Sequence, residues 1–93
     1  MNQIANIARA LRSSRFTHRA LADGSGVVLD LNGSRVIALN PSGMFIVSAV
    51  LDGIDSENEL VTALTEEFEV DANTALADIE DLLCKLAAEL APE

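Results

Sequence analysis

The chain has 93 residues, of which 49% are hydrophobic and only 3% aromatic, so it has room for one domain with a modest aliphatic core. Its formal net charge of −9 argues against a protein that wraps nucleic acid, because phosphate binding depends on Lys and Arg. A single cysteine, Cys84, rules out an internal disulfide and a CxxC metal site.

The charge is unevenly distributed along the chain. The first 51 residues hold five arginines against two aspartates, whereas Lys85 is the one cation of the remainder. A solvated acidic face explains this better than selection of a basic partner, which is the alternative. Neither a secretion signal nor an apolar stretch of membrane-spanning length is visible, so the sequence predicts a cytoplasmic protein with no membrane contact.

Residues 1–14 form either a short amphipathic helix or a disordered arm. Apolar residues recur at helical spacing at Ile4, Ile7, Ala8 and Leu11. A helix of this length is marginal in water unless it docks. Docking onto a second copy of the chain would make a homodimer, an outcome that the sequence leaves open.

Two or three strands are expected next, forming an antiparallel meander. The first covers Phe16–Leu21 and ends at the turn cluster 23–26. Strand formers then occupy Val27–Leu31 and Arg35–Leu39, on either side of Asn32-Gly33. Because both turn residues tolerate positive φ, the pair predicts a tight hairpin between these two strands.

Three helices follow the meander. The first begins at Asn40-Pro41, where Asn caps and Pro tolerates the first helical position, and ends before Gly53. Ser56 and Glu59 form a capping box for a second helix that runs to about Phe68. Asp71 caps a third, which runs to about Leu90 and carries a leucine-rich stripe at i, i+3, i+4 and i+7 spacing.

This order predicts an α+β fold, a winged helix-turn-helix over residues 15–93 in which an N-terminal antiparallel sheet is followed by three helices. Such folds often insert their last helix into the major groove of DNA. Here that helix is acidic, with Asp78, Glu80, Asp81 and Glu89 against Lys85, so nucleic-acid binding is disfavoured.

No group of side chains predicts catalysis, a metal site or a cofactor. His18 is the one histidine and has no visible acid–base partner, so a surface histidine is the better interpretation. Cys84 lies beside carboxylates that disfavour a reactive thiolate. The acidic residues at 66, 67, 69 and 71 lack the spacing and glycine of a calcium loop. The sequence therefore predicts no enzyme.

Several segments in order resemble the PqqD-like family, also called the RiPP recognition element. The family pattern is a hairpin, LN-x-x-G, an apolar helix ending in LDG, a helix ending in acidic-aromatic-x-V-D, and a long leucine-rich helix. The matching segments are VVLDLNGSRVIALNPSGMFIVSAVLDG, SENELVTALTEEFEVD and DIEDLLCKLAAEL. The residues that carry the motifs are Leu39, Asn40, Gly43, Leu51, Asp52, Gly53, Phe68, Val70 and Asp71.

The resemblance implies a non-catalytic peptide chaperone. Such domains bind the leader of a ribosomally made precursor peptide and present it to a modifying enzyme, such as a radical SAM enzyme, a cyclase or a leader peptidase. The leader adds as a strand in the groove between the third strand and the third helix after it. Carried over, the peptide-binding residues are Arg35, Val36, Ile37, Ala38, Leu39, Ala75, Ile79, Leu82, Leu83 and Leu86.

Strand addition is physically sensible because an exposed edge strand is a template for another chain. Arg35 is expected to pair with a leader carboxylate, and Asp78, Glu80 and Asp81 to attract a leader lysine or arginine. Most of a helical leucine stripe is ordinary core, so two or three of its side chains are expected to touch the peptide.

An acyl or peptidyl carrier protein, with phosphopantetheine on Ser56, is the alternative from another class. Carriers are also small, acidic and helical, and Asp55-Ser56 resembles their attachment motif. Against this alternative, the capping box already explains Ser56, Glu57 stands where an apolar residue is expected, and a four-helix carrier has no place for the hairpin.

Overall fold

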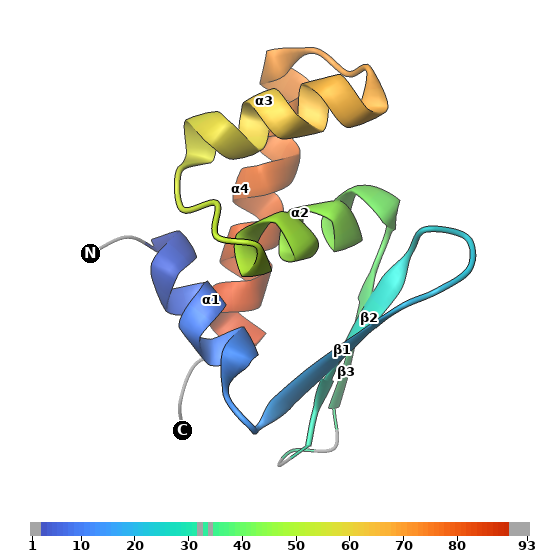
Figure 1. Ribbon diagram of the computed structural model, residues 1–93, viewed down its shortest axis with the longest axis vertical. Coiled ribbons are helices and arrows are strands. Elements are labelled where there is room, and N and C mark those ends of the chain that lie inside the picture. Colours follow the sequence, from blue (N-terminus) through green and yellow to red (C-terminus); the bar gives the residue numbers. More distant parts are fainter. Residues whose placement is uncertain (1–2, 32, 34, 90–93) are drawn as a thin grey trace.

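The computed structural model describes residues 3–31, 33 and 35–89, and places a helix before three strands and three further helices (Figure 1). The elements are α1 (Gln3–Arg12), β1 (Phe16–Ala20), β2 (Gly26–Asp30), β3 (Arg35–Leu39), α2 (Pro41–Leu51), α3 (Glu57–Phe68) and α4 (Ala72–Glu89). The α+β class and the order of strands before helices are confirmed, while the winged-helix detail stays a prediction. Asn32 of the predicted turn and Leu90 at the predicted helix end lie outside the described residues.

The three strands form one antiparallel sheet in the order β1-β2-β3. Asp30 pairs with Phe16 on one side and with Arg35 on the other, and Val28 pairs with Ile37. The sheet therefore has β2 at its centre, and β1 and β3 each have an edge that pairs with no other strand in the described part of the chain.

The two faces of the sheet differ in what covers them. Val28, Ile37 and Leu39 point to the helices and are at most 4% exposed. Paired side chains on the opposite face remain accessible, and Val36 is 64% exposed there. We call this surface the outer face; its apolar members are Val27, Leu29, Val36 and Ala38.

The chain turns from β3 into α2 without a linker. Asn40 has extended backbone angles, and its Oδ1 accepts a hydrogen bond from the Gly43 N–H at 2.8 Å, while Pro41 occupies the first helical turn. Gly53 adopts φ of +113° just after the helix, as its expected capping role requires. This tight connection fixes α2 at the end of β3.

Helix α2 also approaches the sheet closely at Gly26. A Cβ at this position would collide with the Met44 side chain and lie 2.9 Å from the Arg19 carbonyl oxygen. The absence of a side chain therefore lets Met44 pack directly on β2.

Helix α1 contributes to the same core as the rest of the chain. Ile4, Ile7 and Leu11 are at most 4% exposed, and the helix contacts α2, α4 and β1. Arg12 donates to the Leu51 carbonyl oxygen at 2.6 Å, near the C-terminus of α2. The apolar face of α1 is thus covered within one chain. The division into residues 1–14 and 15–93 stays a prediction, as does a homodimer.

None of the helices in the described ranges is both long and apolar enough to cross a membrane.

Asp71 caps α4, as expected from the sequence, and its carboxyl makes this end of the helix sensitive to pH. Its Oδ1 accepts from the Thr74 N–H at 2.7 Å. Bonds from the Thr74 main chain, and then from its side chain, lower the pKa of Asp71 because they favour the charged form.

We expect Asp71→Ala to lower the melting temperature at pH 7 but not at pH 2. A lowered pKa in the folded state gives stability that is present above the unfolded value of about 3.9 and is lost as the pH falls through the folded value. Thermal unfolding of both proteins from pH 7 to 2 measures this. Asp71→Asn, which caps without titrating, is the control and should stay close to the parent at pH 7. An Asp71→Ala deficit that persists unchanged to pH 2 would contradict the assignment.

Candidate functional site

The main-chain groups at the free edge of β3 can be assigned from the sheet register. N–H and C=O groups alternate between the two edges along a strand. The Leu31 N–H donates to the Arg15 carbonyl oxygen at 2.8 Å, so the groups of Leu31 point to β1 and those of Asp30 and Val28 point to β3. Since Val28 pairs with Ile37, the groups of Ile37 point to β2. The groups that point to the free edge are those of Val36 and Ala38.

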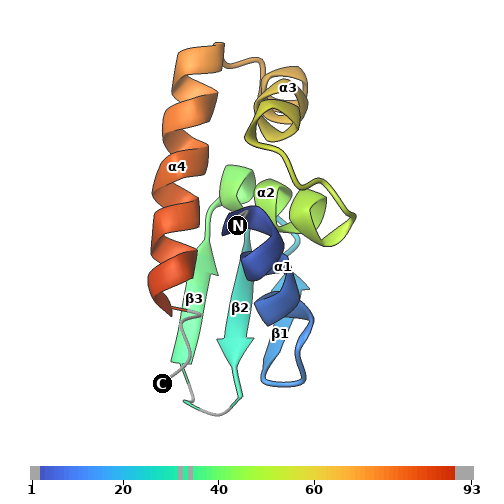
Figure 2. The same cartoon turned by 90° about the vertical axis from the view of Figure 1, so that its left-hand side faces the viewer.

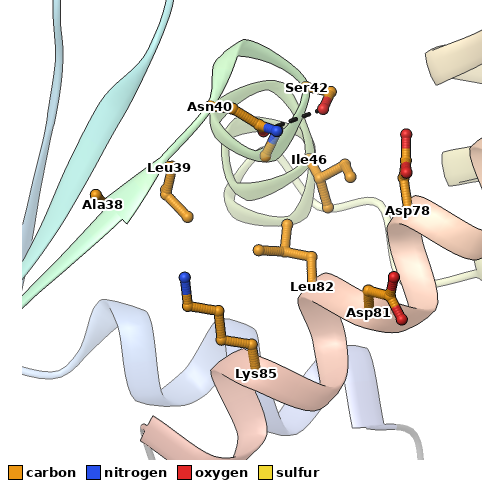
Figure 3. A pocket seen from close by; sticks show the side chains of 10 residues that line it. Ala38, Leu39, Asn40, Ser42, Ile46, Asp78, Asp81, Leu82 and Lys85 are labelled. Atoms are coloured by element: carbon orange, nitrogen blue, oxygen red, sulfur yellow. Dashed lines mark hydrogen bonds between the residues drawn. The ribbon is translucent and has the colours of Figure 1, made fainter.

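A groove of about 400 Å³ lies along this edge, between β3 and α4. Helix α4 runs alongside β3, as Figure 2 shows. Strand β3, the first turns of α2 and α4 all contribute to the lining. The lining residues are Ala38, Leu39, Asn40, Ser42, Gly43, Ile46, Asp78, Asp81, Leu82 and Lys85 (Figure 3). The groove therefore joins unpaired strand groups to side chains of α4.

A second recess of about 330 Å³ adjoins the groove at the end of β3. Asn40, Ser42 and Asp78 line both cavities, and Leu64, Phe68 and Val70 provide the apolar part of the second. Phe68 is 36% exposed and its ring packs edge-on against Phe45, with centroids 5.6 Å apart. An extended chain that leaves the groove past Asn40 would therefore meet an apolar surface.

Outside the groove, the start of β3 is joined to the end of α4 by an ion-pair network around Asp30. The Asp30 side chain is 1% exposed, and its carboxylate accepts two hydrogen bonds from Arg15 at 3.1 and 3.0 Å and one from the Gly33 N–H at 3.1 Å. Arg35 lies 3.6 Å from Asp30 and also reaches Glu89 on α4, 3.7 Å from its carboxylate and 3.3 Å from its carbonyl oxygen. The side chain of Arg35 thus connects β3 to the end of α4, a role that the sequence analysis missed.

The residues expected to bind peptide fall into two groups. All five strand residues lie in β3, and two of them, Ala38 and Leu39, line the groove. Arg35, Val36 and Ala38 are exposed, and Ile37 and Leu39 are buried. Of the five helix residues, Leu82 lines the groove and is half-buried. The other four are at most 1% exposed and belong to the core: Ala75, Ile79, Leu83 and Leu86. Of these five helix residues, Leu82 is therefore the one that is accessible to a ligand.

Asp78 and Asp81 line the groove as their expected role requires, whereas Glu80 does not. Lys85, Asn40 and Ser42 line it too and were not predicted. The sequence gives little indication that these residues line a groove, because the capping role already explains Asn40 and Lys85 enters only the count of charges. The Ser42 hydroxyl is within 3.1 Å of the Asn40 Oδ1, so it serves the cap.

The side chains considered for other chemistries lie apart from the groove. His18 is exposed on β1, and Cys84 is an exposed thiol on α4. Ser56 is the N-cap of α3, and its Oγ accepts the Glu59 N–H at 3.5 Å. Within the described ranges, no three His, Cys, Asp or Glu side chains are placed to hold a metal ion.

Comparisons with known proteins point to one family. The sequence model of the family described as coenzyme PQQ synthesis protein D (PqqD) matches residues 25–89. No curated protein sequence matches the chain significantly. Among solved structures, the chain is similar to TbiB1 in complex with the TbiA(beta) leader peptide, with 28% identity and a TM-score of 0.71. That match covers 83% of this chain and 87% of TbiB1. The chain therefore belongs to the PqqD family, which its motifs resemble.

Proposed function

We propose that this protein binds the leader segment of a ribosomally made precursor peptide, which adds as a fourth strand to β3 in the groove beside α4. The observation that carries the proposal is the unpaired edge of β3 facing that groove, with the outward groups of Val36 and Ala38 along it. Membership of the PqqD family and the likeness to TbiB1, solved with a leader peptide, support the same function.

The energetics suit recognition of a peptide backbone. Two N–H and two C=O groups at the edge offer about four hydrogen bonds, each contributing roughly 0.5–1.5 kcal/mol net. These bonds tolerate many sequences, so selectivity must come from side chains along the groove. Leu82 is placed to contact an apolar side chain of the added strand, and the recess at Leu64, Phe68 and Val70 is placed to take another beyond the strand.

The protein itself would not catalyse the modification. The groove presents main-chain groups, apolar surface and isolated charges, and these groups are suited to binding an extended peptide. In this proposal it delivers the leader to a separate modifying enzyme, such as a radical SAM enzyme, a cyclase or a leader peptidase.

Titration of isotope-labelled protein with the leader of the precursor encoded beside its gene tests the proposal. We expect the largest amide shifts at Val36, Ala38 and along the groove face of α4. The amides of Val36 and Ala38 should also become protected from hydrogen exchange, because the added strand pairs with them.

The amides of β1 provide an internal control, since its free edge is the other site available for strand addition. Shifts confined to β1, or an unchanged spectrum at millimolar leader, would contradict the proposal. A leader that binds without protecting Val36 and Ala38 would rule out addition at β3.

A further inference from the structure

Among the described residues that line the groove, Lys85 is the one cation, and its placement is unusual for a charge on an acidic helix. It is exposed on α4, and none of the ion pairs within the described residues includes it. Asp81 precedes it by four residues, the spacing that favours an acid–base pair on a helix surface. In Figure 3, however, the Lys85 amino group points across the groove toward β3, while the Asp81 carboxylate points the other way.

The position of this amino group coincides with the path of an added strand. Lys85 shares the groove with Ala38 and Leu39, and Ala38 is one of the two residues whose main-chain groups point to the free edge of β3. A strand hydrogen-bonded to Ala38 must therefore pass between Ala38 and α4, beside the Lys85 amino group.

The charges along the groove change in a fixed order. Because Arg35 is tied to Glu89, the C-terminal end of α4 lies beside the start of β3, and Asp78 lies beside Asn40 and Ser42. Passing from the Arg35 end to the Asn40 end, a ligand meets Lys85, then Leu82, then Asp81 and Asp78. Of these groove-lining side chains, Lys85 favours an anion, and Asp81 and Asp78 disfavour one.

We propose that Lys85 determines specificity, by pairing with a single carboxylate of the bound peptide that lies beside Ala38. The peptide would place an apolar side chain on Leu82 and a neutral or basic residue toward Asp78. This inference rests on the proposed function and specifies which side chains the bound leader carries along the groove. In a protein of net charge −9, an acidic peptide gains nothing from the overall field, so the preference is local to Lys85.

The test is a charge-reversal cycle with the leader peptide that binds in the titration. Lys85→Glu should weaken binding about tenfold in low salt, since a surface ion pair is lost and a repulsion gained. Lys85→Met, which keeps the aliphatic stem, should weaken it about threefold, and Lys85→Arg should stay within about twofold. All of these differences should shrink in high salt because the site is exposed.

Each Asp and Glu of the leader is then changed in turn to the corresponding amide. One of these leader variants should bind the parent protein more weakly than the original leader does. The same variant should bind the parent and Lys85→Glu with equal affinity. Changing that same leader residue to lysine should restore binding to Lys85→Glu by about tenfold.

Arg9→Glu is the matched control, because it makes the same change in net charge on the exposed surface of α1, outside the groove. It should alter binding by less than about twofold. Equal losses for Arg9→Glu and Lys85→Glu, or a Lys85→Glu effect that survives every amide substitution, would overturn the inference. In either case the leader still binds at β3, so the proposed function would stand.

Discussion

Replacing Ala38 with proline is expected to weaken leader binding at least about tenfold while the domain stays folded. The Ala38 N–H points to the free edge, so proline removes no bond between β2 and β3. It does remove a donor that the added strand needs, and its ring occupies the space through which that strand approaches. Titration calorimetry measures the loss, and circular dichroism checks the fold.

His18→Pro is the matched control at the opposite edge of the sheet. By the same alternation, the His18 N–H points to the free edge of β1, so proline at this position also removes no hydrogen bond between strands. Its effect on the stability of the sheet should therefore be similar to that of Ala38→Pro. It should leave leader binding close to that of the parent protein. Val36→Pro repeats the test at the second outward N–H of β3. Parent-like affinity in both β3 variants, or a loss only in His18→Pro, would exclude β3 as the binding edge.

Replacing Asp30 with leucine is expected to lower the free energy of unfolding by about 3 kcal/mol. The Asp30 side chain is 1% exposed and pairs with Arg15, whose side chain is 21% exposed, so its removal takes a close anion away from a largely desolvated guanidinium. For a domain of this size the melting temperature should fall by roughly 15 °C. Chemical denaturation provides the free energy, and calorimetry the midpoint.

Two further variants identify the cause of the loss. Glu66→Ala removes an exposed carboxylate on α3 and should change stability by less than about 0.5 kcal/mol. The double variant Arg15→Met with Asp30→Leu replaces both charges of this pair with apolar groups and should recover most of the loss, because neither desolvated charge of the pair remains. If Asp30→Leu alone behaves like Glu66→Ala, the network does not stabilise the fold.

The elements with local signals could be predicted closely from the sequence. Asn40-Pro41 begins α2, Gly53 follows its end, and Ser56 and Asp71 cap the next two helices, because each cap depends on residues within a few positions. The strand pairing could be predicted for the same reason, as β2 and β3 are separated by only a short connection. The free edge of β3 followed from the order of the strands.

The parts of the site that depend on tertiary packing could not be predicted. The stripe on α4 does not itself reveal which apolar side chains face the core, so Ala75, Ile79, Leu83 and Leu86 were grouped with Leu82. Burial of Asp30 depends on Arg15, which reaches it only through the register of β1 with β2. In the structure Asp30 shares the inner face of the sheet with Val28, and the residues next to it in the sequence do not identify its partner.

The outer face of the sheet would differ between the free protein and the protein with a bound leader. A strand added at β3 would extend this surface by its own alternate side chains, next to Val36 and Ala38. The composite surface belongs to neither molecule alone. An enzyme that docks on this composite surface would bind the complex of the protein with its leader, and would bind neither the free protein nor the free leader.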